Sequence, residues 1–174
     1  MPDSLYRNPH WYACRTRARA EKQVDRLLGR AGFETYLPLV ERERQWADRK
    51  KKVEFPLFPG YTFVRFPTER FLDVVRTPGV VTVVGGREEP TPVREEELES
   101  VRRFTQGIHD TGWIPEPAEW WEPGTPVLVA EGPFKGMRGL LLESRGRSRV
   151  AVRLSALRLA VCVELDRKSL RRVA

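Results

Sequence analysis

The stretch PLFPGYTFVRF at residues 56–66 constrains the fold more than any other part of the chain. Two prolines stiffen its approach and Gly60 leaves one freely turning position, after which six strand-forming residues follow. Because strand side chains alternate between faces, Tyr61, Phe63 and Arg65 share one face, and Thr62, Val64 and Phe66 share the other. Both faces carry large apolar groups, which predicts a central strand covered on two sides.

The aromatic pair Tyr61 and Phe63 has two interpretations. The rest of the domain covers these rings, or a partner protein does. Alternation alone favours the first, because most large aromatics in a two-sided strand belong to the core.

Length and charge narrow the class of protein. A chain of 174 residues allows one generous domain or two small ones, and no apolar run approaches the roughly 20 residues of a membrane helix. The two cysteines, Cys14 and Cys162, lie far apart and outside any C-x-x-C pattern, so we expect reduced, buried thiols in a cytoplasmic protein. The net charge of +7 favours a polyanionic partner. Because no long apolar run is present, we expect no membrane partner.

The positive charge is concentrated near the N-terminus. Residues 15–52 hold 12 basic and 6 acidic side chains. A buried stripe is predicted by apolar residues at helical spacing, namely Ala20, Val24, Leu27, Leu28 and Ala31. A second stripe is basic and comprises Arg19, Lys22, Arg26 and Arg30. It is a solvated face or a surface that follows phosphates, and Arg15 and Arg17 extend it onto the preceding strand end.

Residues 41–52 (ERERQWADRKKK) are almost wholly charged around Trp46 and predict a mobile hairpin tip or loop. The run at residues 49–52 is the most concentrated positive patch, and it binds nucleic acid or merely keeps a long hairpin soluble. Further on, Thr68 is expected to cap a short helix through Val75. Thr91 and Pro92 are expected to open a helix that ends near Phe104.

The last third of the chain differs in kind. Residues 105–121 contain two glycines and two prolines and predict a linker without helix or strand. Four short strand-like runs follow, at residues 125–130, 138–144, 148–154 and 159–165, with 170–173 as a fifth. Arg145-Gly146 is a hairpin signal, and about 50 residues of short strands predict a small barrel.

These motifs resemble the NusG family. The N-terminal domain of that family is matched by WY near the start, EKQV at residues 21–24, PLFPGYTFVRF, and TPGV at residues 77–80. EPGTPVLV from residue 122, GPFKGMRG from residue 132, and VAVRL from residue 150 are similar to its C-terminal KOW domain. The resemblance covers nearly the whole chain, with the two domains in the family's order.

The resemblance implies an α+β protein with three parts. Residues 8–105 would form an α/β sandwich with an antiparallel sheet, 106–121 a linker, and 122–174 an SH3-like five-stranded KOW barrel. The protein would be a monomeric transcription elongation or antitermination factor without cofactors. It would bind the clamp helices of bacterial RNA polymerase and suppress pausing or termination. The short, arginine-rich N-terminal domain is similar to operon-specific members of the RfaH type.

The resemblance also implies site residues. The polymerase-binding patch would include the aromatics Phe58, Tyr61 and Phe63, which reverses the core interpretation. The exposed non-template DNA strand would be contacted by the basic positions Arg17, Arg19, Lys22 and Arg30. The KOW tip would present Phe134, an exposed aromatic, together with Lys135 and Met137, to a small-subunit ribosomal protein or to Rho. The alternative interpretation of Phe134 is a loop aromatic folded over the open end of the barrel. Arg70-Phe71-Leu72-Asp73 stands where RfaH-type proteins carry a His-Thr-Thr contact to polymerase, and departs from it.

Two other functions compete. A KOW-containing ribosome- or RNA-binding protein acting in translation would explain the charge and the barrel but not PLFPGYTFVRF. A nuclease would need clustered carboxylates with a metal, or a His or Cys nucleophile. His10 and His109 have no acidic partner pattern, and GPFKGMRG lacks the Gly-Lys-Ser/Thr ending of a phosphate loop. We therefore expect no catalytic residues and no metal site.

Overall fold

The computed structural model describes residues 7–173, which fall into two compact units. Residues 7–39 and 55–94 form the first, and residues 40–54 and 95–173 the second. Both are built from antiparallel strands and helices, so the α+β prediction is confirmed.

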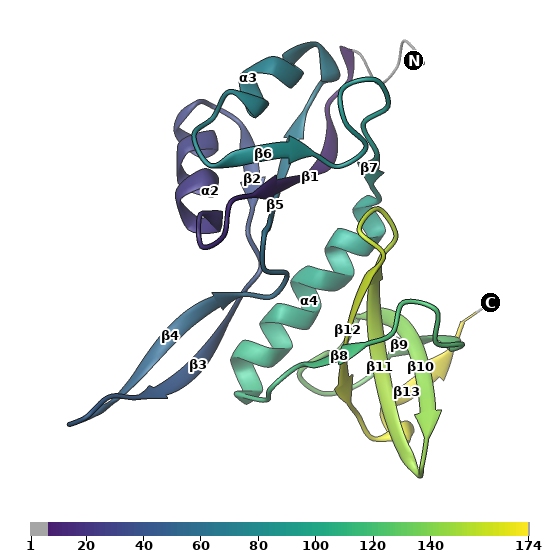
Figure 1. Cartoon of the computed structure of the whole chain (residues 1–174). Helices are drawn as coiled ribbons and strands as arrows, with labels where there is room; N and C mark the ends of the chain where they lie inside the picture. The colour runs from purple at the N-terminus through teal and green to yellow at the C-terminus, as the bar shows by residue number, and fades with distance from the viewer. Residues whose placement is uncertain (1–6, 174) are drawn as a thin grey trace. The chain divides into compact units, whose positions relative to one another are not determined.

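The first unit is a sheet with helices (Figure 1). Its strands are β1 (His10–Thr16), β2 (Glu34–Tyr36), β5 (Tyr61–Phe66), β6 (Val80–Val83) and β7 (Pro92–Val93). Its helices are α2 (Glu21–Arg30), the 3-10 turn η1 (Thr68–Arg70) and α3 (Phe71–Val75). The strand order is β2-β5-β1-β6, with β7 paired to β1, so β5 is an interior strand as predicted.

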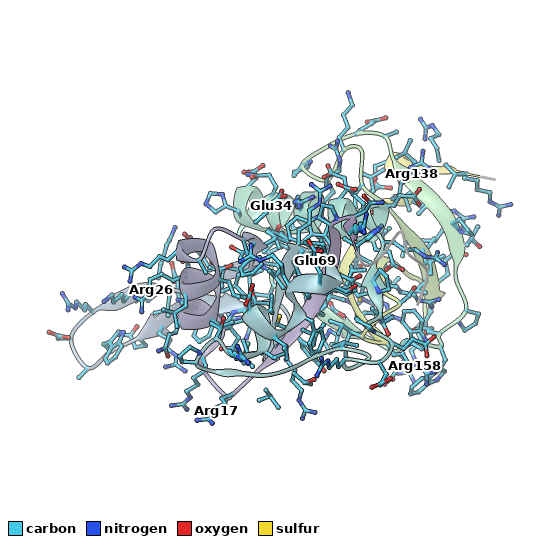
Figure 2. All side chains as sticks on the ribbon, turned by 90° about the horizontal axis from the view of Figure 1, so that it is seen from above. Arg17, Arg26, Glu34, Glu69, Arg138 and Arg158 are labelled. Atoms are coloured by element: carbon cyan, nitrogen blue, oxygen red, sulfur yellow. The ribbon has the colours of Figure 1, made fainter. Side chains whose placement is uncertain are left out.

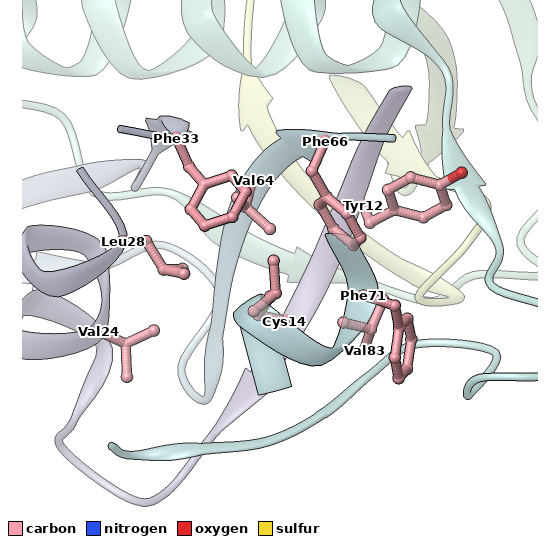
Figure 3. Close-up of a cluster of buried hydrophobic side chains, with 10 residues drawn as sticks. Tyr12, Cys14, Val24, Leu28, Phe33, Val64, Phe66, Phe71 and Val83 are labelled. Atoms are coloured by element: carbon pink, nitrogen blue, oxygen red, sulfur yellow. The ribbon is translucent and has the colours of Figure 1, made fainter. Parts of the chain in front are cut away.

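The side chains of β5 alternate as the sequence predicts. Val64 and Phe66 join a buried cluster that also takes Val24 and Leu28 from α2 and Phe71 from α3 (Figure 3). The Phe66 ring packs on the Tyr12 ring of β1 with centroids 4.8 Å apart. Helices α2 and α3 therefore pack on the face of β5 opposite to Phe63.

A buried carboxylate joins α2 to the start of β5. Glu21 is 6% exposed, and its Oε1 accepts a hydrogen bond from the Gly60 N–H at 2.8 Å. Gly60 has a φ of 87°, a left-handed conformation that glycine adopts without strain. The Thr16 N–H donates to the Gly60 carbonyl at 2.8 Å, so both polar groups of Gly60 are paired. These bonds fix the turn that delivers Tyr61 into the sheet.

Replacing Glu21 with alanine leaves the buried Gly60 N–H without its acceptor. We expect the free energy of unfolding, measured with urea, to fall by about 1.5–3 kcal/mol, the range for hydrogen bonds to charged groups. Glu21→Gln keeps an oxygen acceptor and should lose less. The control is Glu34→Ala, which removes an exposed ion pair with Arg65 at 3.3 Å and should cost under about 1 kcal/mol. Equal losses of unfolding free energy in Glu21→Ala and Glu34→Ala would contradict a stabilising hydrogen bond between Glu21 and Gly60.

Several sequence predictions of helix starts were wrong. Thr68 does not cap its helix: Pro67 holds that position and makes no side-chain cap. The segment after Thr91 forms the short strand β7 on β1, and helix α4 (Glu95–Thr111) begins only at Glu95. Pairing of Pro92 with Tyr12 thus replaces the expected first helical turn.

Helix α4 also ends later than predicted, because it continues past Phe104 to Thr111. The stretch expected to be a linker without helix therefore begins as helix, and Gly107 lies inside it. Pro117 was expected to exclude a strand, yet it lies in β8 (Glu116–Ala118). Strand β8 is at the edge of its sheet, where proline is tolerated because one side makes no ladder bonds.

Six antiparallel strands make up the C-terminal sheet of the second unit, in the order β13-β9-β10-β11-β12-β8. After β8 come β9 (Thr125–Val129), β10 (Arg138–Ser144), β11 (Arg147–Leu154), β12 (Leu159–Glu164), the turn η2 (Arg167–Ser169) and β13 (Leu170–Arg172). The five predicted strands are confirmed. The hairpin at Arg145-Gly146 is confirmed too, with both residues at positive φ.

The charged segment at residues 41–52 is not a loop for most of its length. It forms the hairpin of β3 (Leu39–Gln45) and β4 (Lys50–Pro56), a two-stranded sheet by itself. Pro38 separates β3 from the short strand β2 of the first unit.

Both cysteines are free and buried, as predicted. Burial raises the pKa of the Cys14 thiol to about 12, so almost none of it is thiolate at neutral pH. Over residues 7–173, none of the helices combines the length and the apolar character that a membrane crossing needs.

Candidate functional site

The aromatic residues of the β5 region form one group. Phe63 stacks on Tyr36 of β2 with centroids 6.4 Å apart, and Phe58 meets the Phe63 ring edge-on, also at 6.4 Å. Phe63 has no exposed surface and Phe58 is 3% exposed, whereas Tyr61 is half-buried. The expectation of an open three-ring patch is therefore wrong for Phe58 and Phe63, which the fold uses as core. Of the three predicted residues, Tyr61 keeps surface to offer a partner, and Tyr36 beside Phe63 is half-buried as well.

The basic positions singled out from the sequence lie together in the first unit. Lys22, Arg26 and Arg30 lie on the exposed side of α2, opposite the buried Glu21, Val24 and Leu28. Arg17 and Arg19 are exposed in the turn before α2, and the side chains of Arg17 and Arg26 extend into solvent (Figure 2). We call Arg17, Arg19, Lys22, Arg26 and Arg30 the basic stripe.

The turn that begins the basic stripe has a defined conformation. Arg19 has a φ of 62°, a left-handed conformation that is uncommon outside glycine. The Arg17 N–H donates to the Gly79 carbonyl at 2.8 Å, and the Ala20 N–H donates to the Arg17 carbonyl at 3.1 Å. Gly79 packs tightly here, since a Cβ on it would lie 2.8 Å from Val24. The TPGV segment thus supports the turn that displays Arg17 and Arg19.

Arg70 serves the fold of the first unit. Its guanidinium lies 4.1 Å from the centre of the Phe33 ring, and its Nε donates to Asp73 Oδ2 at 3.0 Å. These contacts join the start of α3 to Phe33, which follows α2. Arg70 and Asp73 therefore have a structural role in this chain, at the position where RfaH-type proteins carry His-Thr-Thr.

The tip of the C-terminal sheet, residues 132–137, differs from its prediction. Phe134 and Met137 were expected to be presented to a partner, and Phe134 to be exposed, but neither has exposed surface. Phe134 packs between Phe104 of α4, at a centroid distance of 6.1 Å, and Trp113, at 5.9 Å. Lys135 is exposed as expected.

The Phe134 ring packs directly against Gly107 of α4. A Cβ on Gly107 would lie 2.3 Å from Phe134 Cδ1, so the ring occupies the space that any other residue would fill. The glycines and prolines of residues 105–121 predicted a break in the helix at Gly107, and this packing role was not predicted. The sequence holds one indication of this packing, because Gly107 follows Phe104 by three residues and so lies on the apolar side of the helix. No nearby residue indicates that Phe134 is the partner.

Polar contacts reinforce this packing. Arg103 Nη1 donates to the Lys135 carbonyl at 3.2 Å, and the Arg103 guanidinium covers Gly136. Nearer the start of α4, Glu97 accepts hydrogen bonds from the hydroxyl and the N–H of Ser155. Helix α4 is therefore bonded near its start and at its middle to the C-terminal part of the second unit.

The described part of the chain holds no candidate metal centre. Between residues 7 and 173, no three His, Cys, Asp or Glu side chains come close enough together to hold a metal ion. His109 is exposed and lies 3.6 Å from Asp110. The Arg147 guanidinium bridges Glu116 at 2.7 Å and Glu164 at 2.8 Å, and so joins β11 to β12 and to the edge strand β8.

Comparison with known proteins gives a consistent result. The family model described as transcription termination factor nusG matches residues 9–102. The transcription termination/antitermination protein NusG of Pseudomonas aeruginosa is 31% identical over 169 residues, which cover 90% of this chain and 94% of that protein. The protein of the same description from Escherichia coli K12 is 31% identical over 137 residues, covering 76% and 74%.

A solved structure of NusG from Thermotoga maritima is similar over nearly the whole length. The two share a TM-score of 0.50 and 22% sequence identity, with 96% of this chain and 98% of that one covered. At this identity the likeness speaks for the fold alone.

Proposed function

The chain belongs to the NusG family of transcription factors, and we propose that it binds the clamp helices of bacterial RNA polymerase and suppresses pausing or termination. The observation that carries this proposal is the family match over residues 9–102, which spans the sheet with Tyr61 at the start of its interior strand β5. A ribosome- or RNA-binding role in translation would leave this domain unexplained.

Tyr61 is the residue we assign to direct polymerase contact. It is half-buried, so part of its ring is anchored in the fold while the rest keeps surface for a partner. Phe63, on the same face of β5, and Phe58 pack on each other in the core. A rigid aromatic anchor offers contact area at low entropic cost, as at many protein interfaces.

The basic stripe is proposed to contact the exposed non-template DNA strand. Arg17, Arg19, Lys22 and Arg30 are all exposed, and none is in an ion pair with another residue of the described chain. Such cations bind phosphates with an affinity that falls as salt rises. Their number on a short, arginine-rich domain is why we place the protein among operon-specific members of the family.

The tip of the C-terminal sheet is proposed to recruit a small-subunit ribosomal protein or Rho through Phe134, Lys135 and Met137. Since Phe134 and Met137 are buried against α4, this partner has to displace the helix from the tip before it reaches them. Lys135, which is exposed, is available for the first encounter.

Tyr61→Ala should reduce binding to purified core polymerase at least tenfold, the usual effect of truncating an aromatic anchor. The matched control is Leu72→Ala, which shortens an apolar side chain that is 38% exposed elsewhere in the same unit. Affinity is measured by pull-down or interferometry, after thermal melts show that both variants are folded. Equal affinities of wild type and Tyr61→Ala would contradict the assignment. Co-sedimentation with ribosomes, and not with polymerase, would favour the translation alternative.

A further inference from the structure

The β3–β4 hairpin has two chemically different faces, and its register shows which residues belong to each. At the tip, the Trp46 N–H donates to the Arg49 carbonyl at 2.8 Å; at the base, the Leu57 N–H donates to the Pro38 carbonyl at 2.9 Å. The two bonds belong to one register, in which residue 44 faces 51 and residue 42 faces 53. The ribbon therefore runs from base to tip without a bulge.

In an antiparallel pair, directly opposed residues lie on the same face, and faces alternate along each strand. The first face, which we call the cationic face, holds Val40, Arg42, Arg44, Trp46, Arg49, Lys51, Val53 and Phe55. The second face holds Leu39, Glu41, Glu43, Gln45, Lys50, Lys52, Glu54 and Pro56. An ion pair between Glu41 and Lys52, at 3.9 Å, agrees with this assignment.

Charge is sorted between the two faces. The cationic face carries four basic side chains and no carboxylate, whereas the second face carries two lysines and three glutamates. Neither Arg49 nor Lys51 is in an ion pair with any other described residue. The charged side chains of the cationic face thus sum to +4 and those of the second face to −1, a separation that solubility alone does not require.

Exposure rises toward the tip. Val40, at the base of the cationic face, is 4% exposed, whereas every residue from 41 to 52 is exposed and Trp46 is 51% exposed. The ribbon is long and two-stranded (Figure 1), and cations two residues apart on a strand lie about 7 Å from one another. The cationic face is thus a row of accessible positive charges that ends in an open indole ring.

We propose that the cationic face binds single-stranded nucleic acid, with Arg42, Arg44, Arg49 and Lys51 on the phosphates and Trp46 stacked on an unpaired base. Rows of cations with an aromatic platform are how proteins hold single strands without reading sequence. A base inside a duplex is already stacked on both sides, so Trp46 gives the preference for unpaired strands. This surface is separate from the basic stripe of the proposed function.

The test measures binding of the full chain to fluorescein-labelled single strands of about 12 nucleotides, within the site size of one small binding module. Oligothymidine and oligouridine arms distinguish DNA from RNA as the source of the strand, and a duplex of equal length is the third arm. Anisotropy is recorded over a range of salt concentrations. Binding through the basic stripe is present in every variant, so differences between variants report the hairpin.

The charge comparison uses matched pairs of substitutions on strand β4. Arg49→Gln with Lys51→Gln removes two cations from the cationic face, and Lys50→Gln with Lys52→Gln removes two from the other face. Affinity falls as salt rises, and we expect the first pair to make this negative slope of log affinity against log salt shallower by about 1.4. The second pair should make it shallower by less than half of that. Equal slopes in the two double variants would overturn the assignment to one face.

The stacking comparison uses Trp46. Trp46→Ala should weaken single-strand binding about tenfold, whereas Trp46→Phe keeps a ring and should retain most of the affinity. Unchanged affinity in Trp46→Ala, or duplex bound as tightly as single strand, would overturn the stacking role. Binding to vesicles rich in phosphatidylserine, with no binding to any oligonucleotide, would overturn the nucleic-acid proposal, since basic and aromatic side chains also suit anionic lipid surfaces.

Discussion

Phe63→Ala is expected to lower the free energy of unfolding of the first unit by about 3–5 kcal/mol, the usual cost of emptying a buried phenylalanine site. Phe63 has no exposed surface, and its ring contacts those of Tyr36 and Phe58. It also lies on β5, with partners on both sides, so the backbone has little freedom to close over the cavity. Urea unfolding followed by near-ultraviolet circular dichroism measures the loss.

Tyr61→Ala is the control for that result. Tyr61 lies two residues before Phe63 on the same face of the strand but is only half-buried, so its truncation should cost less than half as much stability. The two variants should thus separate, with Phe63→Ala weakening the fold and Tyr61→Ala weakening polymerase binding. Equal stability losses would show that Tyr61 belongs to the core as well, and would contradict its assignment to polymerase contact.

Gly107→Ala is expected to lower the free energy of unfolding of the second unit by about 1–3 kcal/mol, the cost of overpacking a buried site. In an open helix the same change stabilises by about 1 kcal/mol, because alanine has the higher helix propensity. Here the added Cβ would lie 2.3 Å from the Phe134 ring, so ring and helix have to separate. Tip amide shifts in NMR spectra and urea unfolding both report that separation.

Two controls isolate the contact between Gly107 and Phe134. Gly29→Ala changes an exposed glycine of α2, where the nearest atom to the new Cβ would be 3.9 Å away, and should be neutral or stabilising. Combining Gly107→Ala with Phe134→Ala removes the clash, so the double variant should lose less than the sum of the two single losses. Strict additivity would contradict a direct contact.

The elements that sequence predicted well are those with a strong local pattern. Alternation in PLFPGYTFVRF predicted the partition of the faces of β5, and its interior position followed because a strand covered on both sides carries large apolar groups on both faces. The stripe of Val24 and Leu28 predicted the buried side of α2. Short valine-rich runs and the Arg145-Gly146 turn predicted most of the C-terminal sheet.

The failures share one physical cause, which is that contacts between distant segments override local preference. Gly107 looks like a helix breaker until Phe134 packs on it, and Pro117 looks like a strand breaker until an edge position accepts it. The glycine-rich turn around Phe134 suited an exposed ring and a folded-over ring alike, and contact with Phe104 and Trp113 decides for burial. The bond between Glu21 and Gly60 spans 39 residues and leaves no local signature.

The site was predicted only in part. The basic stripe is exposed as the helical spacing suggested, whereas the family resemblance overestimated the exposure of Phe58 and Phe63. The two faces of the hairpin were hidden in the sequence, because a change of one residue in turn length would exchange the partners across the ribbon. The hydrogen bond from Trp46 to Arg49 decides the register.

Single-round transcription in vitro is the most direct test of whether this chain acts on elongating RNA polymerase. Purified bacterial polymerase is halted downstream of a promoter and released on a template with a defined pause site and a terminator, with or without the chain. We predict that the wild-type chain shortens the pause and raises readthrough, and that folded Tyr61→Ala does neither at the same concentration. Pause lifetime and readthrough that stay unchanged at saturating wild-type chain would contradict the account.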